Sequence, residues 1–247
     1  MIFLTLLTAA DFQDAQAQQA AGPMTSCAYS FVRKQCYAGQ TRIAQGQFYW
    51  EEAGHRACYD YSGAYRYRFI LSDTAVIGID KRANSGYTLR RSADPQHYEA
   101  VSRSVHVFGQ LLRGISAFGD TVRAGVVGSV DSCIFLETKS AAGTDIVAVT
   151  RESGRPALIE SFDPDGALYR QTRTVYGKGK TGGYLPSRLI VRTRDGSVVT
   201  LDTLLLSKAV VNQPLPPNVF GVSDKCRLVS SVTPSATTLP FFNAPGK

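Results

Sequence analysis

The sequence predicts a mainly β fold in which a single antiparallel sheet is curled into an incomplete half barrel, with one or two lid helices. Two observations predict it. Short segments of alternating apolar and polar residues fill most of the chain, and one central segment has helical spacing instead. A small closed barrel fills its own interior, whereas an open one leaves an apolar cavity that a helix can cover.

The alternating segments are separated by turns that contain Gly, Ser, Asp or Asn. We expect strands at 29–37, 44–52, 57–62, 65–72, 75–81, 86–91, 121–129, 132–138, 145–151, 156–163, 167–176, 186–194 and 197–207. Turn residues at 164–166 and 195–196 predict two of the hairpins between them.

The central segment, from Asp94 to about Arg113, predicts an amphipathic helix. Asp94 suits the N-cap, Pro95 suits the first turn, and Gly114 follows the end. Apolar residues at spacings of three and four form one face of it, and we expect this face to act as a lid. The lid residues are Val101, Val105, Phe108, Leu111 and Leu112.

The last predicted hairpin is followed by an arm, residues 211–220, that ends at Phe220. The hairpin has one apolar and one polar face over part of each strand, so it covers an apolar layer on one side only. Three prolines in the arm exclude a helix there, because proline fixes φ and removes a hydrogen-bond donor.

This order of parts resembles the C-terminal end of the LolA-like family, the periplasmic outer-membrane lipoprotein carriers and lipoprotein-sorting proteins. Residues 46–50 (GQFYW) with 56–61 (RACYDY) are similar to a double strand of that family, and residues 68–80 to the segment after it. The resemblance covers roughly residues 28–222. Two positions depart from the pattern: Thr74 replaces the usual turn glycine, and Ile79 replaces an aromatic residue.

The resemblance implies an exported protein of the periplasm that holds lipid or lipoprotein acyl chains in a half-barrel cavity and transfers them to the outer membrane. It implies a monomer without cofactor, with an inner-membrane donor and an outer-membrane acceptor as partners, and no nucleic acid. The alternative is a LolA-like sensor or scaffold module that binds a protein partner in the cell envelope. Residues 51–55 (EEAGH) are acidic where carriers of this family have a basic latch, which weakens the transfer role more than lipid binding.

The cavity of such a half barrel is lined by inward-facing positions of the strands. Alternation selects Phe48, Trp50, Phe69, Leu71, Ile134, Leu136, Leu189 and Val191. Each methylene that an acyl chain removes from water contributes about 0.8 kcal/mol, so such a lining binds acyl chains without choosing among them. The same residues also suit a core that simply packs the sheet against the helix.

The chain carries a formal net charge of +7. A basic surface suits nucleic acid, an anionic polysaccharide or membrane surface, or an acidic partner. The arginines here, such as Arg173, Arg188 and Arg192, are scattered along strands, which is more typical of a solvated sheet face.

We expect three parts: a signal peptide and N-terminal segment (1–27), the half-barrel domain (28–228) and a Ser/Thr/Pro-rich tail (229–247). The apolar run at residues 2–10 fits a signal sequence, although the usual basic start is missing, and a buried N-terminal helix is the other interpretation.

Five cysteines, Cys27, Cys36, Cys58, Cys133 and Cys226, show neither a C-x-x-C pair nor clustering with histidines. This spacing argues against a metal site or a redox dithiol. In an exported protein up to two disulfides are possible, and one between Cys27 and Cys226 would tie the ends of the domain. Small buried hydrophobic residues are the alternative for Cys58 and Cys133.

No catalytic or metal site is expected. The sequence contains no G-x-S-x-G and no H-E-x-x-H motif. The one local grouping is His55 with Glu51, Glu52 and Asp60, and these residues are more typical of a solvated turn than of an acid–base pair or a metal site. The sequence therefore predicts a protein that is not an enzyme.

Overall fold

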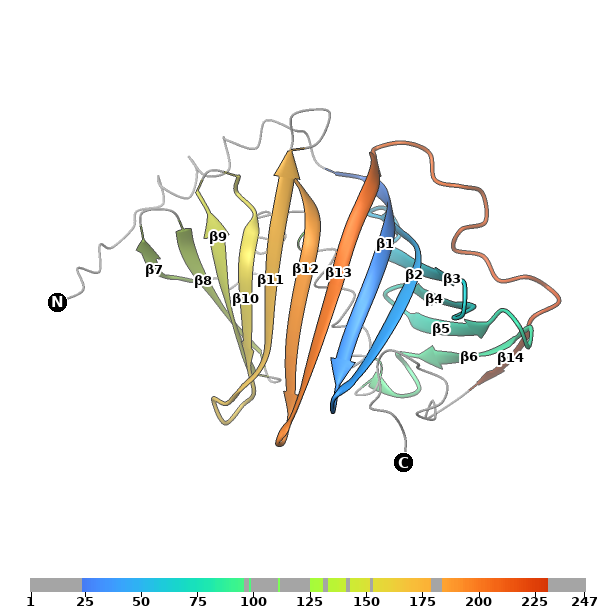
Figure 1. Cartoon of the computed structure of the whole chain (residues 1–247), viewed down its shortest axis with the longest axis horizontal. Coiled ribbons are helices and arrows are strands. Elements are labelled where there is room, and N and C mark those ends of the chain that lie inside the picture. Colours follow the sequence, from blue (N-terminus) through green and yellow to red (C-terminus); the bar gives the residue numbers. More distant parts are fainter. Residues whose placement is uncertain are drawn as a thin grey trace. The chain divides into compact units, whose positions relative to one another are not determined.

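The computed structural model describes residues 24–95, 98, 111, 125–130, 133–140, 143–151, 153–178 and 184–230. They form one sheet of fourteen strands in the order β14-β6-β5-β4-β3-β2-β1-β13-β12-β11-β10-β9-β8-β7 (Figure 1). The pairs from β2 to β6 and from β7 to β12 are antiparallel, whereas β14 is parallel to β6. Because the two end strands of this order, β14 and β7, are not paired with each other, the sheet is not closed into a barrel, and the predicted fold class is confirmed.

Thirteen of these strands are the predicted ones, with ends that differ by a few residues. Their bounds are β1 Ser26–Tyr37, β2 Gln40–Glu51, β3 Arg56–Ser62, β4 Tyr67–Leu71, β5 Ala75–Asp80, β6 Ser85–Arg90, β7 Gly125–Val130, β8 Cys133–Ser140, β9 Gly143–Thr150, β10 Pro156–Phe162, β11 Leu168–Lys178, β12 Tyr184–Asp195 and β13 Val198–Val211. The short strand β14, Arg227–Ser230, was not expected.

Contacts divide the chain into two compact units. Unit 1 consists of Met1–Pro23, Cys36–Gln40 and Gln110–Leu204, and unit 2 of Met24–Gln35, Thr41–Gly109 and Leu205–Lys247. The division into a signal segment, a domain and a tail stays a prediction. Its last boundary falls inside β14, and residues 1–23 and 231–247 lie outside the described residues.

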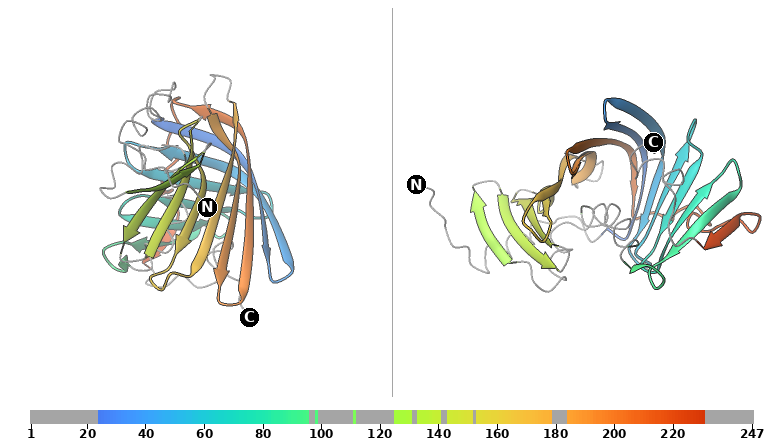
Figure 2. Two further views of the ribbon diagram at one scale, coloured as in Figure 1. Left: turned by 90° about the vertical axis from the view of Figure 1, so that its left-hand side faces the viewer. Right: turned by 90° about the horizontal axis from the view of Figure 1, so that it is seen from below.

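In unit 2 the strand registers sort the side chains of β2 to β6 onto two faces. Figure 2 shows these strands side by side, with β14 beyond β6. One face, here called the aromatic face, consists of Phe48, Trp50, Tyr59, Tyr61, Phe69 and Tyr87, with Tyr29 and Phe31 of β1, of which Phe31 contacts the rings of Tyr59 and Tyr61. The opposite face, here called the arm face, carries Tyr49, Cys58, Asp60, Arg68, Ile70, Ile77 and Ile79.

The arm after β13 is not helical, as its prolines predict, but it is extended only in part, since residues 217–220 form turns. Its first residue, Asn212, accepts a hydrogen bond from the Thr25 amide (2.8 Å) and donates its own amide to the Ser26 carbonyl (2.9 Å). Further along, Phe220, Val222 and Cys226 pack against the buried cluster of the arm face formed by Cys58, Ile70 and Ile79. The arm therefore covers the apolar part of this face before the chain enters β14.

The predicted helix is seen at three positions, since Pro95, Tyr98 and Leu111 are helical. Within unit 2, the buried Tyr98 donates its hydroxyl to the Ser72 carbonyl (2.5 Å). Within unit 1, Leu111 is fully buried and its carbonyl accepts a hydrogen bond from Arg155 (3.5 Å). The other lid residues, Val101, Val105, Phe108 and Leu112, lie outside the described residues. In the part of the chain that the structure describes, no helix is long and apolar enough to cross a membrane.

The proposed tie between Cys27 and Cys226 is wrong: all five cysteines are free thiols. Cys27 alternates with Tyr29 and Phe31 on β1 and so lies on the aromatic face, whereas Cys226 packs on the arm face. The sheet separates the two sulfur atoms. Cys58 is fully buried, which raises the pKa of its thiol to about 12 and fits its interpretation as a small core residue.

Candidate functional site

The aromatic face of unit 2 is filled by rings that contact one another. Phe48, Tyr59 and Phe69 are opposite one another on β2, β3 and β4. Phe31 lies edge-on to Tyr61, with centroids 5.1 Å apart, and Phe48 is 4.8 Å from Tyr59. Offset and edge-on pairs of this kind stabilise beyond the burial of their area. This face is therefore a packed aromatic core.

Polar groups are embedded in this core. The Arg33 guanidinium, which is buried, donates a hydrogen bond to the Tyr61 hydroxyl (2.7 Å). Gly78 on β5 is opposite Phe69 on β4 and Tyr87 on β6, and the Tyr87 ring occupies the space that a side chain at Gly78 would fill. The buried Tyr87 hydroxyl has no hydrogen-bond partner among the described residues, and burial raises its pKa.

In unit 1 a row of side chains crosses five neighbouring strands on one face. Leu136, Val147, Ile159, Thr172 and Val191 are opposite one another in turn on β8, β9, β10, β11 and β12. We call this the aliphatic row. Its first four members are at most 4% exposed, whereas Val191 at its end is partly exposed. Solvent thus reaches this face of β12 at Val191, whereas Leu189 on the same strand and face is buried.

The structure divides the predicted cavity residues into two groups. Phe48, Trp50, Phe69 and Leu71 lie together on the aromatic face, and Ile134, Leu136, Leu189 and Val191 lie together on the face of the aliphatic row. All are buried except Val191. That they line a cavity for acyl chains stays a prediction. Alternation could also have found Tyr29, Tyr59, Tyr61 and Tyr87, which were overlooked because tyrosine is equally common on solvated faces.

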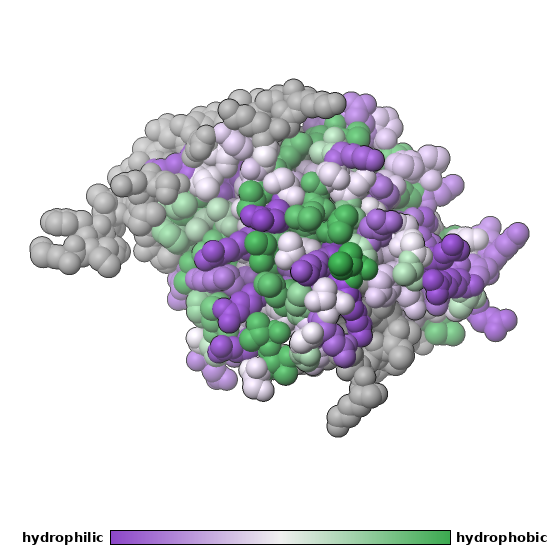
Figure 3. All heavy atoms as spheres, viewed as in Figure 1, coloured by the Kyte–Doolittle hydropathy of each residue, from purple (hydrophilic) through white to green (hydrophobic). Residues whose placement is uncertain are grey.

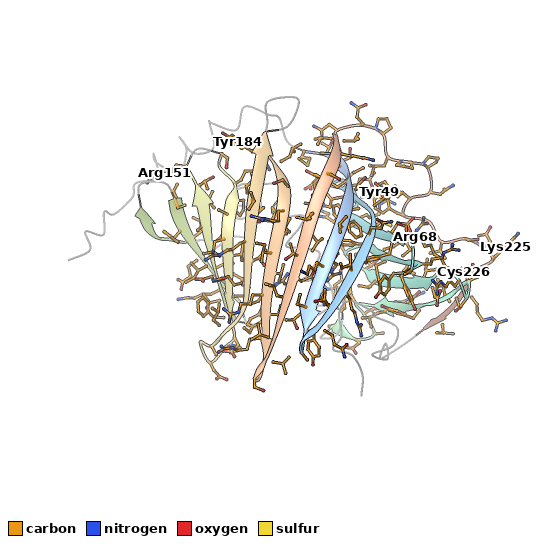
Figure 4. The ribbon with its side chains drawn as sticks, viewed as in Figure 1. Tyr49, Arg68, Arg151, Tyr184, Lys225 and Cys226 are labelled. Carbon is orange, nitrogen blue, oxygen red and sulfur yellow. The ribbon has the colours of Figure 1, made fainter. Side chains whose placement is uncertain are left out.

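A charged cluster lies on the arm face, beside the arm. Asp60 accepts hydrogen bonds from Arg68 (2.6 Å) and from Lys81, and Lys81 also donates to the Tyr61 carbonyl (2.6 Å). Figure 4 shows Arg68 in this part of unit 2. Burial alone would raise the pKa of Asp60, but the hydrogen bonds and charges of Arg68 and Lys81 outweigh it and lower the pKa.

Asp60→Asn is expected to lower the free energy of unfolding by about 1–2 kcal/mol at pH 7, because it removes two half-buried ion pairs. Since the folded pKa is lowered, this stabilisation is complete above the unfolded pKa of about 3.9 and disappears as the pH falls through the folded pKa. Urea unfolding from pH 7 to pH 3 checks this, and the gap in unfolding free energy between wild type and variant should narrow as the pH falls below about 3.9. Exposed Asp145→Asn is the control, and a gap that is independent of pH would contradict the prediction.

The turn around His55 does not assemble a site. The Glu51 carboxylate is bound by Arg56 (2.9 Å to Nε), and Asp60 is held by its two cations. His55 itself is exposed at a turn with positive φ. Among the described residues no group of three His, Cys, Asp or Glu side chains is arranged to hold a metal ion.

Solved structures share this architecture over most of the chain. The DUF1329 family protein from Desulfovibrio piger has a TM-score of 0.64 at 12% identity, with 85% of this chain and 95% of that chain covered. A putative outer membrane lipoprotein-sorting protein domain from Vibrio parahaemolyticus has a TM-score of 0.58 at 13% identity, covering 86% and 95%. A LolA superfamily protein from Nitrosomonas europaea has a TM-score of 0.55 at 15% identity, covering 87% and 98%.

No family model and no curated protein sequence matches the chain. Its likeness to known proteins is therefore a likeness of structure, and identities of 12–15% carry the fold alone. The open, nearly all-β sheet and these three neighbours agree with the resemblance read from the sequence, and the chain has a LolA-like fold.

Proposed function

We propose that this protein is an exported carrier or binder of lipid or lipoprotein acyl chains, which it takes across the periplasm to the outer membrane. The observation that supports it best is the aliphatic row of unit 1. Its side chains are hydrocarbon apart from Thr172, and its last member, Val191, is partly exposed. The likeness to an outer membrane lipoprotein-sorting protein domain points to the same class of cargo.

An apolar row of this kind suits a carrier because its attraction to an acyl chain is not directional. Burial contributes about 0.8 kcal/mol per methylene regardless of the lipid. A chain of about ten buried methylenes thus gains enough to bind and is still released when an acceptor offers a similar surface. Neither step needs a catalytic group, so the proposal is for a protein that is not an enzyme.

Native mass spectrometry of the protein purified from the periplasm tests the proposal, before and after extraction with organic solvent. We expect a heterogeneous additional mass that extraction removes and that resolves into acyl lipids. A single mass equal to that of the processed chain, unchanged after incubation with lipid, would overturn the carrier role.

The second candidate is a module that binds a protein partner of the cell envelope. It is favoured by the packing of the aromatic face, where Phe48 and Phe69 are each 1% exposed and contact neighbouring rings. These rings leave no space for an acyl chain between them, so this face of unit 2 does not need a lipid cargo. Recovery of the lipid-free protein in a stoichiometric complex with an envelope protein supports this candidate instead.

A further inference from the structure

The face of unit 1 opposite the aliphatic row carries arginines and aliphatic residues in alternation. On β11 and β12 this arginine face carries Tyr169, Gln171, Arg173, Val175, Arg188, Ile190, Arg192 and Arg194, and the exposed Val199 and Leu201 of the neighbouring β13 are assigned to it as well. All four arginines are exposed, and Val175, Val199 and Leu201 are 37–41% exposed. Figure 3 shows hydrophobic and hydrophilic side chains next to one another over these strands.

In the register of β11 with β12 these arginines are not opposite acidic residues. Arg173 is opposite Ile190, Arg188 is opposite Val175, and Arg192 is opposite Gln171. Solvated sheets gain stability when opposite charges face each other across strands, and that arrangement is missing here. The nearest acid in register, Glu160 on β10, accepts a hydrogen bond from Gln171 (2.7 Å). Among the described residues, the four arginines form no side-chain hydrogen bond or ion pair with one another or with other side chains.

We propose that the arginine face docks on an anionic phospholipid membrane surface. The guanidinium fork binds phosphate oxygens in pairs, and each basic residue close to an anionic bilayer contributes about a fivefold gain in partitioning. The aliphatic side chains between the arginines reach the level of the lipid headgroups and bury apolar area there.

The side chains between the arginines are mostly aliphatic, which favours a lipid surface over the other polyanions. Surfaces that bind single-stranded nucleic acid place aromatic rings between their basic residues so that bases can stack on them. Val175, Ile190, Val199 and Leu201 lie between the arginines here and match an acyl-rich interface. One aromatic residue, Tyr169, shares the face on β11, which is fewer rings than a run of stacked bases needs. A bilayer of anionic lipid fits both the arginines and the aliphatic side chains of this face.

Vesicle flotation of the full chain tests the proposal, with phosphatidylcholine vesicles and with vesicles containing roughly 30% phosphatidylglycerol. We expect binding to the anionic vesicles only, weakened when NaCl is raised from about 50 to about 300 mM. The triple variant R188Q/R192Q/R194Q is expected to lower the partition coefficient about 100-fold, at about fivefold for each arginine.

A second triple variant, R66Q/R90Q/R227Q, removes the same charge from exposed positions of unit 2 and serves as the matched control. It should keep most of the binding. Equal losses in the two triple variants would show that net charge alone matters and would overturn the proposal, as would absence of wild-type binding to the anionic vesicles.

The arginine face and the aliphatic row lie on opposite sides of the same strands, so the two proposals fail separately. The arginine variants should leave the lipid mass seen by native mass spectrometry unchanged. An unloaded protein that still floats with anionic vesicles would overturn the carrier role and support the docking surface.

Discussion

Replacement of Gly46 by alanine is expected to lower the free energy of unfolding by about 2–3 kcal/mol, at the upper end of the usual cost of overpacking. A Cβ atom at this position would overlap the backbone carbonyl oxygen of Asp60 and lie 2.9 Å from Cζ of Phe31. Gly46 is opposite Tyr61 on β3, and Phe31 is only 2% exposed. Neither neighbour has room to move, so β2 and β3 must separate locally.

Chemical denaturation followed by circular dichroism measures this effect. Gly177→Ala is the matched control, since Gly177 is also within a strand and its nearest neighbour, Ser187, would lie 3.8 Å from the new Cβ. The control should be neutral or slightly stabilising, because alanine restricts the unfolded chain. Similar unfolding midpoints for the two variants would show that the close approach at Gly46 relaxes at little cost.

The alternation of apolar and polar residues was sufficient to predict thirteen strands, but not the registers between them. Whether Phe48, Tyr59 and Phe69 form a row or are staggered depends on long-range pairing, and a shift by one residue would move each side chain to the other face. The accommodation of the Tyr87 ring above Gly78 is a consequence of that register.

Strand β14 could not be predicted for a different reason. It is four residues long, it adjoins a Ser/Thr/Pro-rich segment, and it pairs with β6, which is far away in the sequence. The path of the arm could not be predicted from the sequence either. Its prolines exclude a helix, but only the packing of Phe220 and Val222 on the arm face shows what the arm covers.

The sequence predicts which residues of the candidate site are buried, but not whether they form a core or a binding surface. Seven of the eight proposed cavity residues are buried, which alternation predicts for any inward-facing position. A core residue and a residue that lines a binding surface have the same chemistry, so the sequence cannot distinguish them. The difference is visible in the structure at Val191, where the burial of the aliphatic row decreases.

Val191→Asp is therefore expected to reduce the acyl lipid that copurifies with the protein by tenfold or more. In the empty protein the new carboxylate keeps water, since this position is partly exposed, and the fold should survive. An acyl chain lying along the row would remove that water from the charge, at a cost of several kcal/mol, which exceeds the gain from a few methylenes.

Quantification of extracted fatty acids per mole of protein measures the effect, with Val191→Leu expected to retain the wild-type load. Val32→Asp is the charge-matched control, because Val32 is 41% exposed on β1, where it alternates with the buried Phe31 and Arg33. Equal loads in the two aspartate variants would mean that the cargo does not contact the aliphatic row. A loss of lipid confined to Val191→Asp, with unchanged circular dichroism, would place the acyl chain against β12, because the two aspartate variants carry the same added charge and differ only in its position.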